Sequence, residues 1–174
     1  MNLPNKLTIF RVILIPFFVF FLLAPYFTGY GNYIAVGIFI LASLTDLLDG
    51  KIARKYHLVT DFGKFMDPLA DKLLVCAAMI CLVEQKMLPA WIVIIIISGF
   101  RLIASDNGIV IAASYWGKFK TTFQMLMIIV LILNIDLPFF KVLGVVLTYV
   151  ALVLTVISLI DYLAKNKDVL KEQK

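Results

Sequence analysis

The chain has 174 residues, of which 63% are hydrophobic and 16% are charged, and its mean hydropathy is +1.02. Soluble domains average roughly 45–50% apolar and about 25% charged residues, so this composition excludes a soluble globule, a disordered chain and a disulfide scaffold. The formal net charge is +5. Because the basic residues flank apolar runs, they favour contact with lipid head groups over nucleic acid. We therefore expect an all-α protein that crosses a membrane several times and has no nucleic-acid partner.

Six apolar runs follow one another along the chain, separated by short segments marked by glycine, proline or charge. A membrane-spanning helix needs about 20 mostly apolar residues. The predicted spans are residues 9–27, 33–48, 65–83, 88–104, 121–135 and 139–163, the second continuing as a helix toward Arg54. The first run lacks the small-residue cleavage site of a removable signal, and the polar residues before it are expected to lie at the interface. No repeat or linker is evident, so residues 1–174 are predicted to form one domain.

Basic residues predict the orientation, because cytoplasmic loops of membrane proteins carry an excess of lysine and arginine. On one side of the predicted layout the loops hold only Lys86 and Lys141. The other side holds Lys6, Arg11, Lys51, Arg54, Lys55, Lys64, Arg101, Lys118, Lys120 and the lysines of residues 165–174. Both termini are therefore predicted to be cytoplasmic, in agreement with an even number of spans, and the expected location is the cell membrane.

Four aspartates stand out in this apolar chain, since Asp46, Asp49, Asp67 and Asp71 lie within 26 residues. The first two are three residues apart and the last two are four apart, so each pair shares a helix face. A tight connection between their helices would gather four carboxylates at the cytoplasmic surface. Such hard oxygen ligands favour Mg²⁺, Mn²⁺ or Ca²⁺, and paired carboxylates commonly hold Mg²⁺ together with a substrate phosphate. The competing interpretation is a set of solvated cap and loop charges, as expected for Asp61.

Small residues and one arginine accompany these aspartates. Gly50 and Gly63 leave bare backbone and space beside the carboxylate faces. Arg54 lies two helical turns beyond Asp46, in position to clamp a phosphate that a metal also binds. The pattern indicates a site for a divalent metal and a phosphate.

The segment at residues 45–72, TDLLDGKIARKYHLVTDFGKFMDPLADK, resembles the signature of the CDP-alcohol phosphotransferase family. That signature, D-x2-D-G-x2-A-R-x8-G-x3-D-x3-D, is met at all its fixed positions by Asp46, Asp49, Gly50, Ala53, Arg54, Gly63, Asp67 and Asp71. With residue frequencies of roughly 1 in 20, a chance match is on the order of 10⁻¹⁰ for each starting position. The resemblance is therefore highly specific.

Other segments resemble the branch of the family that makes phosphatidylglycerophosphate in bacteria. Residues 4–11 are similar to its P-N-x-L-T-x-x-R opening. Residues 98–101 are similar to its [ST]-G-x-R segment and residues 117–121 to its G-K-x-K-T segment. Residues 106–114 also resemble this branch in composition. One departure falls at residues 92–97, which are wholly apolar where that branch usually has an Arg-Glu pair. Either the acceptor pocket differs or a short piece of the fourth span is missing.

The resemblance implies that a CDP-linked lipid donates its phosphatidyl group to an alcohol and releases CMP. The four aspartates would bind one or two Mg²⁺ or Mn²⁺ ions, and Asp71 would also be the general base toward the acceptor hydroxyl. The CDP group would contact Asp46, Asp49, Gly50, Ala53, Arg54 and Gly63. Asn5, Thr8 and Arg11 would border the same pocket, although an interfacial anchor is an alternative role for them.

The acceptor expected from this resemblance is glycerol 3-phosphate, with CDP-diacylglycerol as the donor. Arg101, Lys118, Lys120 and Thr121 are predicted on one cytoplasmic face, where they would clamp the acceptor phosphate. The alternative is that these basic groups only touch lipid head groups. Inositol phosphate or serine remains open as a different acceptor for the same chemistry.

Two interpretations outside this enzyme class compete with it. Clustered membrane carboxylates also mark the ion path of a divalent-cation transporter, although transporter sites lie near the bilayer midplane rather than at helix ends on one side. A purely structural membrane subunit accounts for the hydrophobicity but not for the aspartate spacing. For the enzyme, the resemblance suggests a homodimer.

Overall fold

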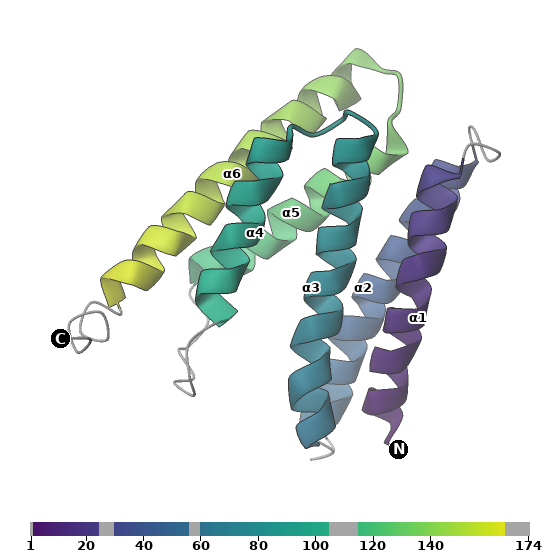
Figure 1. Ribbon diagram of the computed structural model, residues 1–174, viewed down its shortest axis with the longest axis vertical. Helices are drawn as coiled ribbons and strands as arrows, with labels where there is room; N and C mark the ends of the chain where they lie inside the picture. The colour runs from purple at the N-terminus through teal and green to yellow at the C-terminus, as the bar shows by residue number, and fades with distance from the viewer. Residues whose placement is uncertain (1, 25–29, 56–59, 105–114, 166–174) are drawn as a thin grey trace. The chain divides into compact units, whose positions relative to one another are not determined.

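The computed structural model describes residues 2–24, 30–55, 60–104 and 115–165, and every regular element in these ranges is an α-helix. The helices of the described ranges (Figure 1) are α1 (Leu3–Leu23), α2 (Gly31–Lys55), α3 (Asp61–Glu84), α4 (Ala90–Ala104), α5 (Tyr115–Leu133) and α6 (Pro138–Lys165). They match the predicted spans in number and order. The prediction of an all-α fold with six helices is confirmed.

Two helices, α1 and α5, begin six residues earlier than hydropathy predicted. α1 begins at Leu3 rather than at residue 9 and has a proline in its first turn, where the fixed φ and the missing N–H of proline fit well. α5 begins at Tyr115 rather than at residue 121, so Lys118 and Lys120 lie inside a helix and not in a loop. Hydropathy detects only the apolar part of a helix, and both helices begin with polar turns.

Several helices are suited to a membrane. Three described segments are long and apolar enough to cross one: Asn5–Leu23, Trp116–Leu133 and Pro138–Asp161. α2 contributes a shorter apolar stretch, Gly31–Asp46. α4 has 15 residues and is therefore about 22 Å long, against the roughly 30 Å of a hydrocarbon core. The chain is a polytopic membrane protein.

The described chain divides into two compact units, and each is considered by itself. The first holds α1, α2 and α3, and the second holds α4, α6 and nearly all of α5. In the second unit α4 packs against α6. Gly144 of α6 faces α5 so closely that an added Cβ would lie 3.0 Å from Leu131 Cδ2.

In the first unit, α1 runs antiparallel to α2 and parallel to α3 (Figure 1). The ring of Phe18 on α1 lies 5.9 Å from that of Phe39 on α2, and both side chains are fully buried. At the far end of α1, the Gln85 side chain donates a hydrogen bond of 2.8 Å to the carbonyl oxygen of Leu22. α1 contacts both neighbours extensively, whereas α2 and α3 touch each other only weakly. α1 is therefore the central support of this unit.

Candidate active site

The site begins where α3 begins. Thr60 is the N-cap of α3, and its hydroxyl oxygen accepts a 3.1 Å hydrogen bond from the backbone N–H of Gly63. The same hydroxyl donates a 2.9 Å hydrogen bond to Oδ1 of Asn5 on α1. A Cβ on Gly63 would lie 3.3 Å from each of these two oxygens and 3.5 Å from Asp67 Oδ2. The missing Cβ of Gly63 therefore lets Asn5 and Thr60 approach the beginning of α3, next to Asp67.

Three polar side chains follow one another at intervals of three residues on α1, and all are buried. Asn5 is 8% exposed, while Thr8 and Arg11 are fully buried. Residues three apart lie on neighbouring positions of one helix face. This face of α1 is turned toward the helices that carry the aspartates, as the contacts of Thr8 and Arg11 show.

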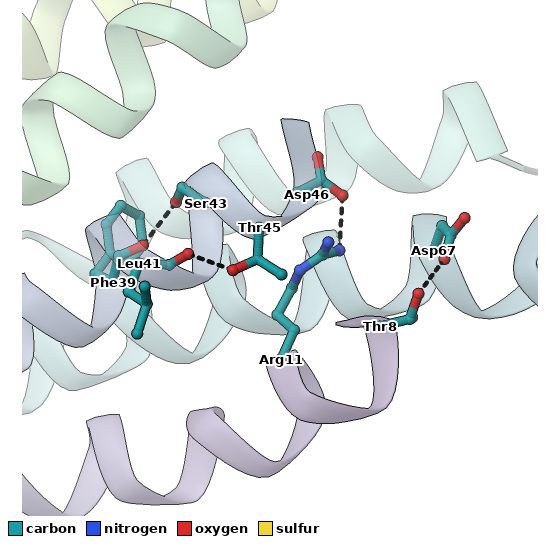
Figure 2. Close-up of polar contacts among 8 residues, drawn as sticks. All are labelled: Thr8, Arg11, Phe39, Leu41, Ser43, Thr45, Asp46 and Asp67. Atoms are coloured by element: carbon teal, nitrogen blue, oxygen red, sulfur yellow. Dashed lines mark hydrogen bonds and ion pairs between the residues drawn. The ribbon is translucent and has the colours of Figure 1, made fainter. Parts of the chain in front are cut away.

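Figure 2 shows Arg11 and Thr8 of α1 reaching an aspartate on each neighbouring helix. Arg11 forms an ion pair of 2.6 Å between its Nη1 and Oδ1 of Asp46 on α2, whose side chain is 30% exposed. Thr8 donates a hydrogen bond of 2.5 Å from its hydroxyl to Oδ1 of Asp67 on α3. The first unit therefore connects both signature helices to α1 through their aspartates.

Asp71 belongs to the same group of charges. It interacts electrostatically with Asp46 and Arg11, and Asp46 in turn interacts with Asp67. Three of the four predicted aspartates therefore lie in the first unit, each of them partly buried and within electrostatic range of another. The side chains of Asp49, Gly50, Ala53 and Arg54 lie outside the described ones, so their predicted roles stay predictions.

The donor chemistry of this group suits a hard divalent cation, because carboxylate oxygens are the ligands that Mg²⁺ and Mn²⁺ prefer. Among the described side chains, no three carboxylate, imidazole or thiol groups are close enough together to form a metal centre by themselves. Asp46 is instead held by Arg11. A complete metal site thus calls for a ligand beyond the described side chains, and Asp49 stands at the signature position for one.

The predicted acceptor residues lie in the second unit. Lys120 is 2% exposed and Lys118 is exposed, although both belong to α5. The hydroxyl of Thr121 donates a hydrogen bond of 2.9 Å to the carbonyl oxygen of Lys118 in its own helix. The Arg101 side chain lies outside the described ones. Lys120 is thus buried, whereas a lysine that only touched lipid head groups would be exposed.

The ion pair of Arg11 with Asp46 is the contact that the sequence does not predict. The sequence places Arg11 among the orientation charges and at the border of the nucleotide pocket, and in the structure its side chain is fully buried and paired with Asp46. The available signal was its position inside an otherwise apolar run, since ionisable residues there usually have a partner or a function.

Comparison with protein families identifies the chain. The family model described as CDP-alcohol phosphatidyltransferase matches residues 1–157. The chain belongs to this family. It is therefore a phosphatidyltransferase, which decides against the cation transporter and the structural subunit.

Three relatives with the same name illustrate the similarity. The chain is 44% identical to "CDP-diacylglycerol--glycerol-3-phosphate 3-phosphatidyltransferase" of Bacillus subtilis, over 98% of this chain and 97% of the relative. The protein of the same name from Haemophilus influenzae is 43% identical, over 95% and 94%, and that from Salmonella typhimurium is 38% identical, over 99% and 98%. The alignment with the Bacillus protein runs over 189 positions, so at least 15 of them have no counterpart in the 174 residues of this chain.

Proposed function

We propose that this phosphatidyltransferase moves the phosphatidyl group of CDP-diacylglycerol to glycerol 3-phosphate, giving phosphatidylglycerophosphate and CMP. The observation that carries the proposal is the pair of contacts by which Arg11 and Thr8 of α1 hold the signature aspartates Asp46 and Asp67 on the two neighbouring helices. The nearly full-length similarity to relatives named for this reaction supports the choice of donor and acceptor.

The reaction is a displacement at phosphorus. The hydroxyl oxygen of the acceptor attacks the phosphorus of the phosphatidyl group, the bond from that phosphorus to the bridging oxygen breaks, and CMP leaves with the electron pair. Asp71 takes the hydroxyl proton, a role that suits a partly buried carboxylate beside other negative groups. When bound, Mg²⁺ or Mn²⁺ would neutralise charge on the diphosphate and on the departing CMP. Asp46, Asp67 and Asp49 would hold that ion.

Recognition of the acceptor is assigned to basic residues of the second unit. Arg101, Lys118 and Lys120 would bind the phosphate of glycerol 3-phosphate, and Thr121 lies beside them in sequence. The apolar residues 92–97 keep a second acceptor in consideration, since the usual Arg-Glu pair is absent there. We place the site at the cytoplasmic surface of the cell membrane, where the basic residues predict both termini to lie.

An acceptor screen with the purified full-length chain tests this function. CMP release from CDP-diacylglycerol would be measured with Mg²⁺ or Mn²⁺ and with glycerol 3-phosphate, inositol phosphate or serine. We expect release with glycerol 3-phosphate and its loss with a chelator. Because general-base catalysis contributes roughly 10²–10⁴-fold, Asp71→Asn should lower kcat by about that range. Full activity of this variant would exclude Asp71 as the base, and full use of glycerol 3-phosphate by Arg101→Ala would exclude the phosphate clamp.

A further inference from the structure

The two helices that carry the signature aspartates are held by a third helix more than by each other. α2 and α3 touch only weakly, while α1 contacts both of them extensively. A site made from Asp46 on α2 and Asp67 on α3 therefore depends on α1 for its geometry. Catalytic groups must be held within about 0.5 Å of their productive positions, so the contacts that α1 makes with these carboxylates matter.

Thr8 is the first of these contacts. Serine and threonine hydroxyls inside helices commonly donate to the carbonyl four residues earlier, and such bonds are made here by Ser43, Thr45, Thr121, Thr122, Thr148 and Thr155. The hydroxyl of Thr8 reaches a different helix, where it lies 2.5 Å from Asp67 Oδ1. The other oxygen of Asp67, Oδ2, lies beside Gly63. The hydrogen bond from Thr8 thus orients the Asp67 carboxylate, with Oδ2 on the side of Gly63.

Arg11 is the second contact, one turn further along α1. Its guanidinium group is permanently charged and fully buried, and it holds Asp46 Oδ1 at 2.6 Å. It also interacts with Asp71. This fixed positive charge interacts with Asp46 and Asp71 and so offsets part of the repulsion between their carboxylates.

We propose that Thr8 and Arg11 are positioning residues of the phosphatidyltransferase, which hold Asp67 and Asp46 in the orientation needed for a divalent cation. This inference rests on the proposed function, because it assumes that these aspartates bind the metal. The Thr8 hydroxyl would thus orient a metal-binding carboxylate rather than contact the nucleotide. Partners that orient metal ligands typically affect metal affinity or activity by about 10–100-fold.

The test compares three variants of the full-length chain in detergent. Thr8→Val removes the hydroxyl and keeps the shape, Thr8→Ser keeps the hydroxyl, and Thr148→Val removes a buried hydroxyl that bonds within its own helix. Mn²⁺ binding would be measured by electron paramagnetic resonance, with and without CMP. We expect Thr8→Val to weaken Mn²⁺ binding by about tenfold or more, while Thr8→Ser and Thr148→Val stay within about twofold of the original chain.

The outcomes separate this inference from the proposed function. If the original chain binds Mn²⁺ and Asp67→Asn abolishes that binding, the metal site is supported. Unchanged Mn²⁺ affinity in Thr8→Val would then overturn the positioning role alone, and a higher KM for CDP-diacylglycerol with the same Mn²⁺ affinity would return Thr8 to the nucleotide pocket. If the original chain binds no Mn²⁺ with or without CMP, both the metal site and the inference fail.

Arg11 is tested by Arg11→Lys, because lysine keeps the charge but lacks the planar fork of the guanidinium group. We expect this variant to bind Mn²⁺ more weakly by about tenfold, and a matched Lys6→Arg change at the exposed start of α1 to leave binding unaltered. Thermal unfolding of each variant shows whether it is folded. Equal Mn²⁺ affinity in folded Arg11→Lys would overturn the role of the guanidinium geometry.

Discussion

At the scale of single residues, Gly63 decides how closely α1 approaches the beginning of α3. A Cβ there would lie 3.3 Å from Asn5 Oδ1 and 3.3 Å from Thr60 Oγ1. Thr60 Oγ1 donates a hydrogen bond to Asn5 Oδ1 and accepts one from the N–H of Gly63, so neither oxygen can move freely. A methyl group at this position would have to separate contacts that hold the two helices together.

We therefore predict that Gly63→Ala destabilises the protein by about 1 kcal/mol or more, as overpacking commonly does. CMP release should fall as well, because Asp67 Oδ2 lies next to this position. Gly37 on α2 is the matched control, since a Cβ there would meet nothing within 4 Å. Gly37→Ala should leave activity unchanged and increase helix stability by up to about 1 kcal/mol. Thermal midpoints in detergent measure both effects, and equal midpoints for the two variants would contradict the crowding argument.

At the scale of elements, the start of α3 has one residue with two functions. Thr60 caps the helix through the N–H of Gly63 and also donates to Asn5 of α1. An N-cap side chain contributes about 1 kcal/mol to stability. The same hydroxyl therefore begins one helix and fastens it to another.

Replacing this hydroxyl should affect both functions at once. We predict that Thr60→Ala lowers stability by about 1 kcal/mol and that Thr60→Ser, which keeps a hydroxyl at the same place, recovers most of the loss. The measurement is the thermal midpoint of each purified variant. If Thr60→Ser were as unstable as Thr60→Ala, the methyl group of Thr60 rather than its hydroxyl would hold the beginning of α3.

The six helices could be predicted from hydropathy, but the beginnings of α1 and α5 could not. α1 and α5 each start with a polar turn, and a polar turn looks like a loop when only apolar length is counted. Helix propensity and a proline in the first turn act locally and extend α1 to Leu3. The consequence reaches the site, because these early residues include Asn5 and Thr8.

The aspartate pairs could be predicted from the sequence, whereas the contacts that hold them could not. Spacings of three and four residues place two carboxylates on one helix face whatever the tertiary structure is. The partners Arg11 and Asp46 are 35 residues apart in the sequence, and no periodicity connects them. Their pairing follows from the antiparallel packing of α1 on α2. It becomes visible only when both helices are placed.

At the scale of the whole molecule, the chain has few charged residues, and some of them have more than one role. The chain has 16 basic residues, and the positive-inside rule uses most of them to fix orientation. Arg11 is also a site residue, since it is buried against Asp46. Lys86 and Lys141 are predicted on the opposite side, and Lys141 is paired with Asp136 at 2.6 Å, where the hydrogen bond from Lys141 lowers the pKa of Asp136. The predicted orientation therefore depends on these two lysines being outnumbered by the basic residues of the other side.

Cysteine labelling tests this orientation at two exposed lysines on opposite predicted sides. Lys6 lies at the start of α1, and Lys86 lies in the turn between α3 and α4. In a chain whose native Cys76 and Cys81 are replaced by alanine, Lys6→Cys should react with a membrane-impermeant maleimide only in inside-out vesicles. Lys86→Cys should react only in intact cells, because α1, α2 and α3 lie between it and Lys6 and three traverses of the bilayer put the two residues on opposite sides. Labelling of both positions from the same side would mean that these three helices do not each cross the membrane, and the site would then need a new placement.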